Sequence, residues 1–142
     1  MKVLLDTCVV VDFLQKRAPF ADDALRIFRS MAMEQFSGFI TAKAATDIFY
    51  LSHRNNHSNE ESRALLQKLL ELVALLDTAA IDVQRALYSG ISDYEDAVMA
   101  ETGKRTGMDC LVTRNTKHYR NSPLPVYEPQ DFLHLLEESD IE

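Results

Sequence analysis

Residues 3–14 read VLLDTCVVVDFL, and this stretch places two aspartates, Asp6 and Asp12, inside a strongly apolar run. A buried carboxylate without a partner is very costly, so each aspartate either lies outside the core or meets a positive charge. Residues 2–5 are typical of a short buried strand that ends at Asp6, and residues 9–14 of a helix or loop. We therefore expect Asp6 at the end of a strand and Asp12 as a helix-end or loop charge.

Strands and helices alternate along the rest of the chain. The patterns predict strands at 39–41, 75–77, 110–113 and 126–127, and helices at 22–35, 42–54, 58–73, 79–88, 93–106 and from Pro129 onward. Ser58 with Glu61, and Ser92 with Glu95, have the spacing of capping boxes, and Gly107 is a C-terminal stop. This alternation predicts an α/β sandwich around a parallel sheet.

Length and composition predict one domain spanning residues 1–142. The chain has 46% hydrophobic residues, which suits a single core, and no run approaches the roughly 18 apolar residues of a membrane span. Its two cysteines form no disulfide framework, and its N-terminus does not resemble a signal peptide, so we expect a reduced, cytoplasmic protein. A net charge of −7 argues against a passive phosphate-binding surface, but it is compatible with a nucleic-acid enzyme whose acids surround a cation.

Two polar residues are expected at the same edge of the sheet. Asp6 follows the first strand directly, and Asn115 comes two residues after the strand at 110–113. Ligands of parallel α/β sheets bind beyond the carboxyl ends of the strands. This edge is therefore the expected functional site.

Four aspartates are candidates for a metal site: Asp6, Asp47, Asp93 and Asp96. Asp93 and Asp96 share one face in the first turn of a predicted helix, where the helix dipole favours negative charge, so helix capping is the alternative role for Asp93. Carboxylates brought together must bind a proton or a cation, and oxygen ligands suit Mg²⁺ or Mn²⁺. The alternative is that all four are ordinary solvated charges.

Three stretches resemble one known family. The stretches that resemble PIN domains, and within them the VapC-type toxins of toxin–antitoxin pairs, are DTCVVVDFL at 6–14, TDIFYL at 46–51 and DYEDAVMAETGKRTGMDCLVTRNTKHYRNSPLPVYEP at 93–129. The resemblance covers essentially the whole chain. It implies a three-layer α/β/α sandwich and a metal-dependent ribonuclease.

The resemblance also implies site residues. The family's acids fall on Asp6, Asp47 and Asp96, with Asp93 as a companion one turn earlier, and the last site position falls on Asn115. Two departures stand out. Asp47 is one methylene shorter than the common Glu, and Asn115 is neutral where many relatives carry Asp. In the toxin branch an acid often follows three residues later, where this chain has His118.

The implied reaction is hydrolysis of RNA phosphodiester bonds, with Mg²⁺ or Mn²⁺ activating water. Thr7 is expected to assist through its hydroxyl or to form a local turn bond, and Cys8 to be a packing residue. The basic run of Arg114, Lys117, His118 and Arg120 either holds RNA phosphates or forms a solvated loop.

The resemblance further implies an antitoxin partner and a homodimer, and the leucine-rich helix that follows Ser58 is a candidate contact surface unless its leucines are buried. A phosphoryl-transfer protein with a nucleophilic aspartate fits poorly, because Cys8 stands where a dehalogenase-type site needs a second aspartate. The remaining alternative is a catalytically impaired PIN-like domain that binds RNA or an antitoxin.

Overall fold

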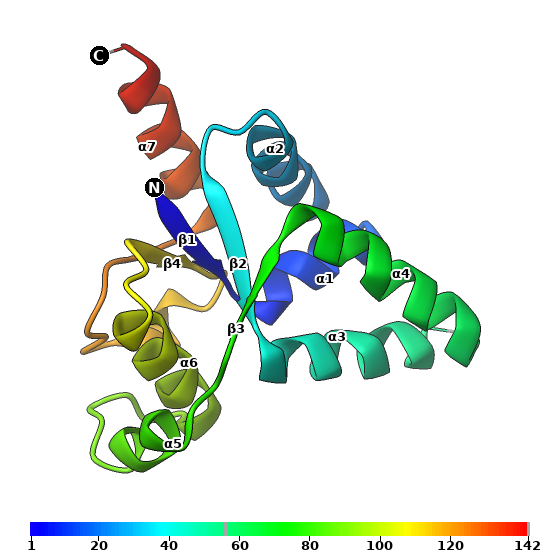
Figure 1. The fold of residues 1–142 in the computed structure, drawn as a ribbon. Helices are drawn as coiled ribbons and strands as arrows, with labels where there is room; N and C mark the ends of the chain where they lie inside the picture. The colour runs from blue at the N-terminus through cyan, green and yellow to red at the C-terminus, as the bar shows by residue number, and fades with distance from the viewer. Residues whose placement is uncertain (56, 142) are drawn as a thin grey trace.

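The computed structural model describes residues 1–55 and 57–141, and a five-stranded sheet forms its centre (Figure 1). The strands are β1 (Lys2–Leu5), β2 (Ser37–Thr41), β3 (Ala74–Leu76), β4 (Cys110–Val112) and β5 (Val126–Tyr127). They lie in the order β3-β2-β1-β4-β5, and every pairing is parallel. The predicted parallel α/β sheet is therefore confirmed, with β1 at its middle.

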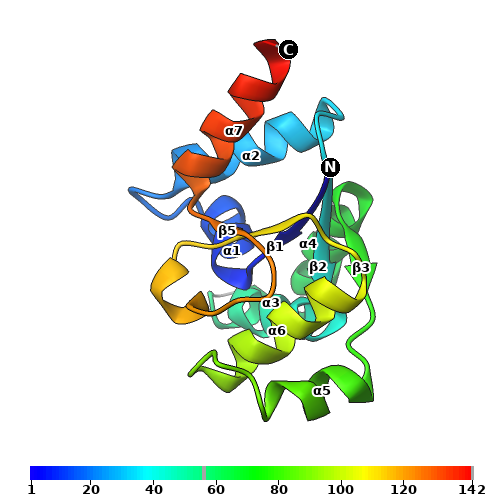
Figure 2. The same cartoon turned by 90° about the vertical axis from the view of Figure 1, so that its left-hand side faces the viewer.

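Helices cover both faces of this sheet. They are α1 (Thr7–Gln15), α2 (Ala21–Ala32), α3 (Ala42–Arg54), α4 (Asn59–Leu72), α5 (Ala80–Ala86), α6 (Tyr94–Arg105) and α7 (Pro129–Ile141), with the short 3-10 helix η1 (Thr116–Tyr119) after β4. Helices α1, α2 and α7 lie on one side of the sheet, and α5 and α6 lie on the other (Figure 2). The molecule is thus the α/β/α sandwich that the family resemblance implied.

Side-chain alternation in β1 divides the core between these two layers. Val3 and Leu5 pack with α1, α2 and α7, whereas Leu4 packs with α6 on the opposite face. Successive side chains of a strand point to opposite faces, so three residues in a row can all be buried. Asp6 is the first residue beyond this buried run, which places it at the carboxyl edge of the sheet.

One predicted helix start is correct and another is wrong. Ser58 and Glu61 form the expected capping box at α4. Helix α6, however, begins one residue too late for a Ser92 cap, and Oδ1 of Asp93 accepts the N–H of Asp96 at 3.0 Å instead. Aspartate caps as well as serine does, so the nearer side chain takes the position.

The prediction for Asp12 is also wrong. Asp12 is 1% exposed, and its carboxylate accepts two hydrogen bonds from the guanidinium of Arg114, one of them 3.2 Å long. The guanidinium also lies over the Phe20 ring, 3.9 Å from its centroid. The two residues of the ion pair are 102 positions apart, and nothing local in the sequence indicates their contact.

The leucine-rich helix α4 is mostly directed into the core. Leu69 is buried and Leu66 and Leu70 are partly buried against the core, while Leu72 is 41% exposed. Packing against the core therefore accounts for most of the leucine side chains of α4. In the part of the chain that the structure describes, no helix combines the length and apolarity that crossing a bilayer requires.

Candidate active site

Asp6 lies where β1 passes directly into α1. Its Oδ1 accepts the N–H of Thr7 at 2.7 Å, which makes Asp6 the N-cap of α1. A carboxylate at a helix N-terminus is stabilised by the backbone N–H groups and by the positive end of the helix dipole. The sequence therefore folds so that one negative charge is held, 8% exposed, at the edge of the sheet.

The end of the neighbouring strand β4 holds the other oxygen of Asp6. The hydroxyl of Thr113 donates to Oδ2 of Asp6 at 2.7 Å and itself accepts the backbone N–H of Asn115 at 3.0 Å. Asp6 and Asn115 thus meet at one edge, as expected, but Asn115 acts through its backbone on Thr113. This chain of bonds fixes the orientation of the Asp6 carboxylate.

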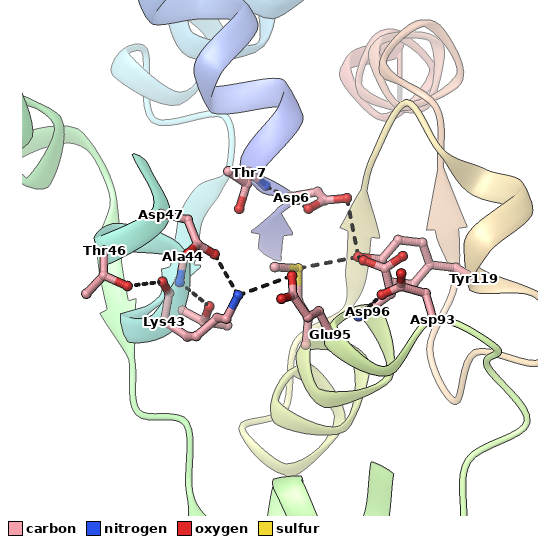
Figure 3. A network of polar contacts seen from close by, with 12 residues as sticks. Asp6, Thr7, Lys43, Ala44, Thr46, Asp47, Asp93, Glu95, Asp96 and Tyr119 are labelled. Atoms are coloured by element: carbon pink, nitrogen blue, oxygen red, sulfur yellow. Dashed lines mark hydrogen bonds and ion pairs between the residues drawn. The ribbon is translucent and has the colours of Figure 1, made fainter. Parts of the chain in front are cut away.

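Tyr119 joins Asp6 to Asp96. Its hydroxyl lies 3.3 Å from Oδ2 of Asp6 and 3.1 Å from Oδ1 of Asp96, and the ring is buried (Figure 3). A phenol has one hydrogen to donate, so it satisfies only one of the two carboxylates at a time. Burial and the two negative charges raise the pKa of Tyr119, which keeps the phenol protonated.

The surroundings of Asp96 disfavour the charged form of its carboxyl group. Burial, then the charge of Asp6 and then that of Asp93, raise its pKa, against the opposing effects of Tyr119 and His118. The ring Nδ1 of His118 lies 3.3 Å from Oδ2 of Asp96. Two neighbouring carboxylates that share one hydroxyl form a site that favours either a proton or a cation.

Lys43 connects the acids on the other side of this pair. Its ammonium lies 2.7 Å from Oδ2 of Asp47 and 3.2 Å from Oε2 of Glu95, and so bridges α3 and α6 (Figure 3). Burial lowers the pKa of Lys43, but the bonds to Asp47 and Glu95 outweigh this and raise it. Asp47 therefore already has a positive partner.

These groups line one pocket of about 360 Å³. Its lining includes Asp6, Thr7, Lys43, Asp47, Glu95 and Asp96. Three of the four predicted aspartates thus border the same space, whereas Asp93 serves as the cap of α6. Four acidic and two basic side chains line this pocket, so one divalent cation would balance their formal charges.

The donor set fits a Mg²⁺ or Mn²⁺ ion held by two carboxylates. Among residues 1–55 and 57–141, no three His, Cys, Asp or Glu side chains are grouped as a metal site. Mg²⁺ is commonly bound through only one or two carboxylates, with waters and substrate phosphates completing its octahedron. Asp6 and Asp96 supply that pair, while Asp47 is engaged by Lys43.

Four further residues of the site were not predicted from the sequence. Thr113 and Tyr119 bind the aspartates, and Lys43 and Glu95 form the charged bridge. Thr113 ends a predicted strand beside Asn115, and Lys43 stands four residues before Asp47 in a predicted helix, so position and i,i+4 pairing were available signals. Nothing in the sequence distinguishes Tyr119 from its basic neighbours.

The predicted RNA contacts fall into different environments. Lys117, His118 and Arg120 are exposed around η1, whereas Arg114 is held by Asp12. Thr7 lines the pocket and donates its N–H to Asp6. The thiol of Cys8 is partly buried, and burial and the charge of Asp6 raise its pKa, as a packing role requires.

Comparisons with known proteins agree with this architecture. The model of the PIN domain family matches residues 2–117. The fold is similar to that of chains in VapBC2 of Rickettsia felis bound to promoter DNA (TM-score 0.69, 18% identity, covering 90% of this chain and 98% of the other) and in FitAcB of Neisseria gonorrhoeae (0.67, 19%, 90% and 98%). It is also similar to a toxin–antitoxin complex of Klebsiella pneumoniae (0.65, 20%, 89% and 97%). No curated protein has a significantly similar sequence.

Proposed function

The chain belongs to the PIN domain family, and from that membership we propose that it is a Mg²⁺- or Mn²⁺-dependent endoribonuclease that hydrolyses phosphodiester bonds in RNA. The observation that carries the proposal is the pair of Asp6 and Asp96, whose carboxylates share the Tyr119 hydroxyl beside an open pocket. A bound divalent ion would lower the pKa of water and stabilise charge on the phosphoryl group.

Each protein group has a distinct part in this proposal. Asp6 and Asp96 hold the ion, Thr113 and Tyr119 orient them, and Asn115 fixes Thr113 through its backbone N–H. Asp93 sets the start of α6 and adds negative charge near Asp96, and Asp47 holds Lys43. Lys117, His118 and Arg120 are exposed in or next to η1, and in this proposal they contact phosphates of the strand.

We also propose that the protein is the toxin of a toxin–antitoxin pair, acts in the cytoplasm and forms a homodimer. Support comes from the similar folds in VapBC and FitAcB complexes and from the exposed apolar side chains Val83, Leu87 and Tyr88, of which Tyr88 is 90% exposed. Exposed apolar side chains that lie close together in the sequence are candidates for contacts with another protein. Co-purification with the product of a neighbouring short reading frame, and the mass in solution, test these two points.

The decisive experiment compares cleavage of labelled single-stranded RNA in Mn²⁺ by the wild type and by D6N and D96N. We expect each variant to lose more than about 100-fold in rate, because even residues that only orient metal ligands contribute 10- to 100-fold. D131N, which changes an exposed aspartate of α7, is the matched control and should cleave normally. Equal cleavage by D6N and wild type would contradict the proposal.

A second candidate is an impaired domain that binds RNA or an antitoxin without cutting. It is favoured by His118, which faces Asp96 at 3.3 Å at a position where relatives often carry an acid, and by the neutral Asn115. RNA binding with no difference in cleavage between wild type and D6N would support this candidate over the nuclease.

A further inference from the structure

One face of α3 carries a row of polar side chains into the pocket. Lys43, Asp47, Tyr50 and Arg54 all line it. Their spacing of four, three and four residues places them on a single stripe of the helix. The stripe begins beside the acidic pair and runs to the last turn of α3.

The outer half of this stripe is exposed to solvent, and the Tyr50 ring meets the neighbouring Phe49 ring edge to face, 5.2 Å between centroids. Tyr50 is 61% exposed, although it borders the pocket, and the Arg54 side chain makes no ion pair or hydrogen bond within residues 1–55 and 57–141. The one acid of the stripe, Asp47, is paired with Lys43 at 2.7 Å. An exposed aromatic ring and an unpaired guanidinium thus follow one another one turn apart.

We propose that this stripe is a subsite for single-stranded RNA, in which Tyr50 stacks on a base and Arg54 holds a backbone phosphate. The proposal rests on the ribonuclease function above and names the form of its substrate. Aromatic rings bind bases of any identity through their faces, and arginine binds phosphate oxygens in a fixed planar geometry. Together they would direct a strand along α3 toward Asp6 and Asp96.

The net charge of the chain favours a local cationic subsite for RNA. The chain carries a net charge of −7, so the RNA backbone is repelled over most of its surface unless local cations meet it. Of the predicted basic run, Arg114 is already held by Asp12, which leaves the exposed residues Lys117, His118 and Arg120, while Arg54 adds a cation in the lining of the pocket itself. A duplex fits less well, because its bases are stacked inside and cannot reach Tyr50.

The test measures binding of a short fluorescent single-stranded RNA to D6N protein, in which the strand stays intact, and adds Y50A, Y50F or R54A. R63A, at an exposed arginine of α4 outside the pocket, is the matched control. We expect Y50A to weaken binding by roughly 5- to 100-fold, and Y50F to retain affinity, because the ring face and not the hydroxyl makes the contact. R54A should reduce the salt slope by about 0.7, the value for one phosphate on a single strand.

The outcomes separate this subsite from the proposed function. If Y50A and R54A bind as R63A does, or if Y50A weakens binding of an RNA duplex and of the single strand equally, the subsite is wrong even when D6N abolishes cleavage. If D6N cleaves like the wild type, the nuclease mechanism is wrong whatever the α3 variants show. If D6N protein binds no RNA, the subsite is wrong, whereas the nuclease fails only if the wild type also leaves the RNA uncut.

Discussion

The hydroxyl of Tyr119 lies 3.1 Å from Oδ1 of Asp96, although the two residues are 23 positions apart and belong to η1 and α6. The same hydroxyl reaches Oδ2 of Asp6 at 3.3 Å. One neutral donor therefore lies between two carboxylates, one at the end of β1 and the other in α6. Its removal should affect the metal-free protein more than the metal-bound one, because a cation would take over the same oxygens.

Y119F tests this arrangement by deleting the hydroxyl and keeping the ring. Hydrogen bonds to charged groups contribute about 1.5–3 kcal/mol, so in EDTA the free energy of unfolding should fall by about this amount. Mn²⁺ should narrow the difference between variant and wild type. Urea unfolding with and without Mn²⁺ measures both quantities, and Y127F, a partly buried tyrosine of β5, is the control. Equal stability of Y119F and wild type in EDTA would contradict the assigned role.

The raised pKa of Asp96 predicts a pH dependence of stability without metal. Burial first, and then Asp6 and Asp93, raise this pKa above its ordinary value of 3.8. A carboxyl with a raised pKa in the folded state favours folding fully only below that ordinary value, and its contribution is lost as pH rises through the folded pKa. In EDTA, D96N should therefore be more stable than wild type at pH 7, and the gap should close toward pH 3.8.

Thermal unfolding of the wild type and of D96N across this pH range, in EDTA and in Mn²⁺, shows which of the two proteins is the more stable. Mn²⁺ should stabilise the wild type at pH 7 and have little effect on D96N, because a ligand that binds only the folded state adds RT ln(1 + [L]/Kd) of stability, and loss of a carboxylate ligand raises Kd. A wild type that is more stable than D96N in EDTA at pH 7 would refute the account.

Most helices and strands could be predicted from the sequence, because the signals that start and end them lie within a few residues of one another. The apolar run before Asp6, the capping box at Ser58 and the stop at Gly107, which has φ +77°, all act within a few residues. The start of α6 was missed because Ser92 and Asp93 are both good caps, and sequence alone does not choose between neighbours. Strand order could not be read from local signals, because it depends on how helices pack on the sheet.

Only those site residues that directly follow a strand or lie in the first turn of a helix could be predicted from the sequence. Asp6 and Asp96 satisfy that condition, and the structure brings them together. Tyr119 reaches them from a basic surface segment, and Arg114 reaches Asp12 across 102 residues, so neither contact leaves a local pattern. Charged residues that look alike in one segment, such as Arg114 and Arg120, then have different environments, one held by an ion pair and the other exposed.

R114M and R120M separate these two arginines. Breaking a buried ion pair leaves an uncompensated charge and costs about 3–5 kcal/mol, and we expect about 3 kcal/mol for R114M because the Arg114 side chain is 23% exposed. R120M should leave stability unchanged and weaken RNA binding. Urea unfolding and RNA titration of both variants decide the point. If R114M is as stable as R120M, the ion pair between Arg114 and Asp12 does not stabilise the fold. Arg114 is then again a candidate for contact with an RNA phosphate.

Lys43 sets how strongly the pocket attracts a cation. Removing its charge in K43M frees Asp47 and Glu95 of their partner. For a divalent ion about 10 Å away in water, one unit charge changes the binding energy by on the order of 0.8 kcal/mol, or about fourfold in affinity. K43M should therefore bind Mn²⁺ about fourfold more tightly, D47N about fourfold more weakly, and K68M, at an exposed lysine of α4, like the wild type. Titration of Mn²⁺ followed by its paramagnetic resonance signal distinguishes this effect from direct ligation, because loss of a true ligand would make D47N bind as poorly as D6N.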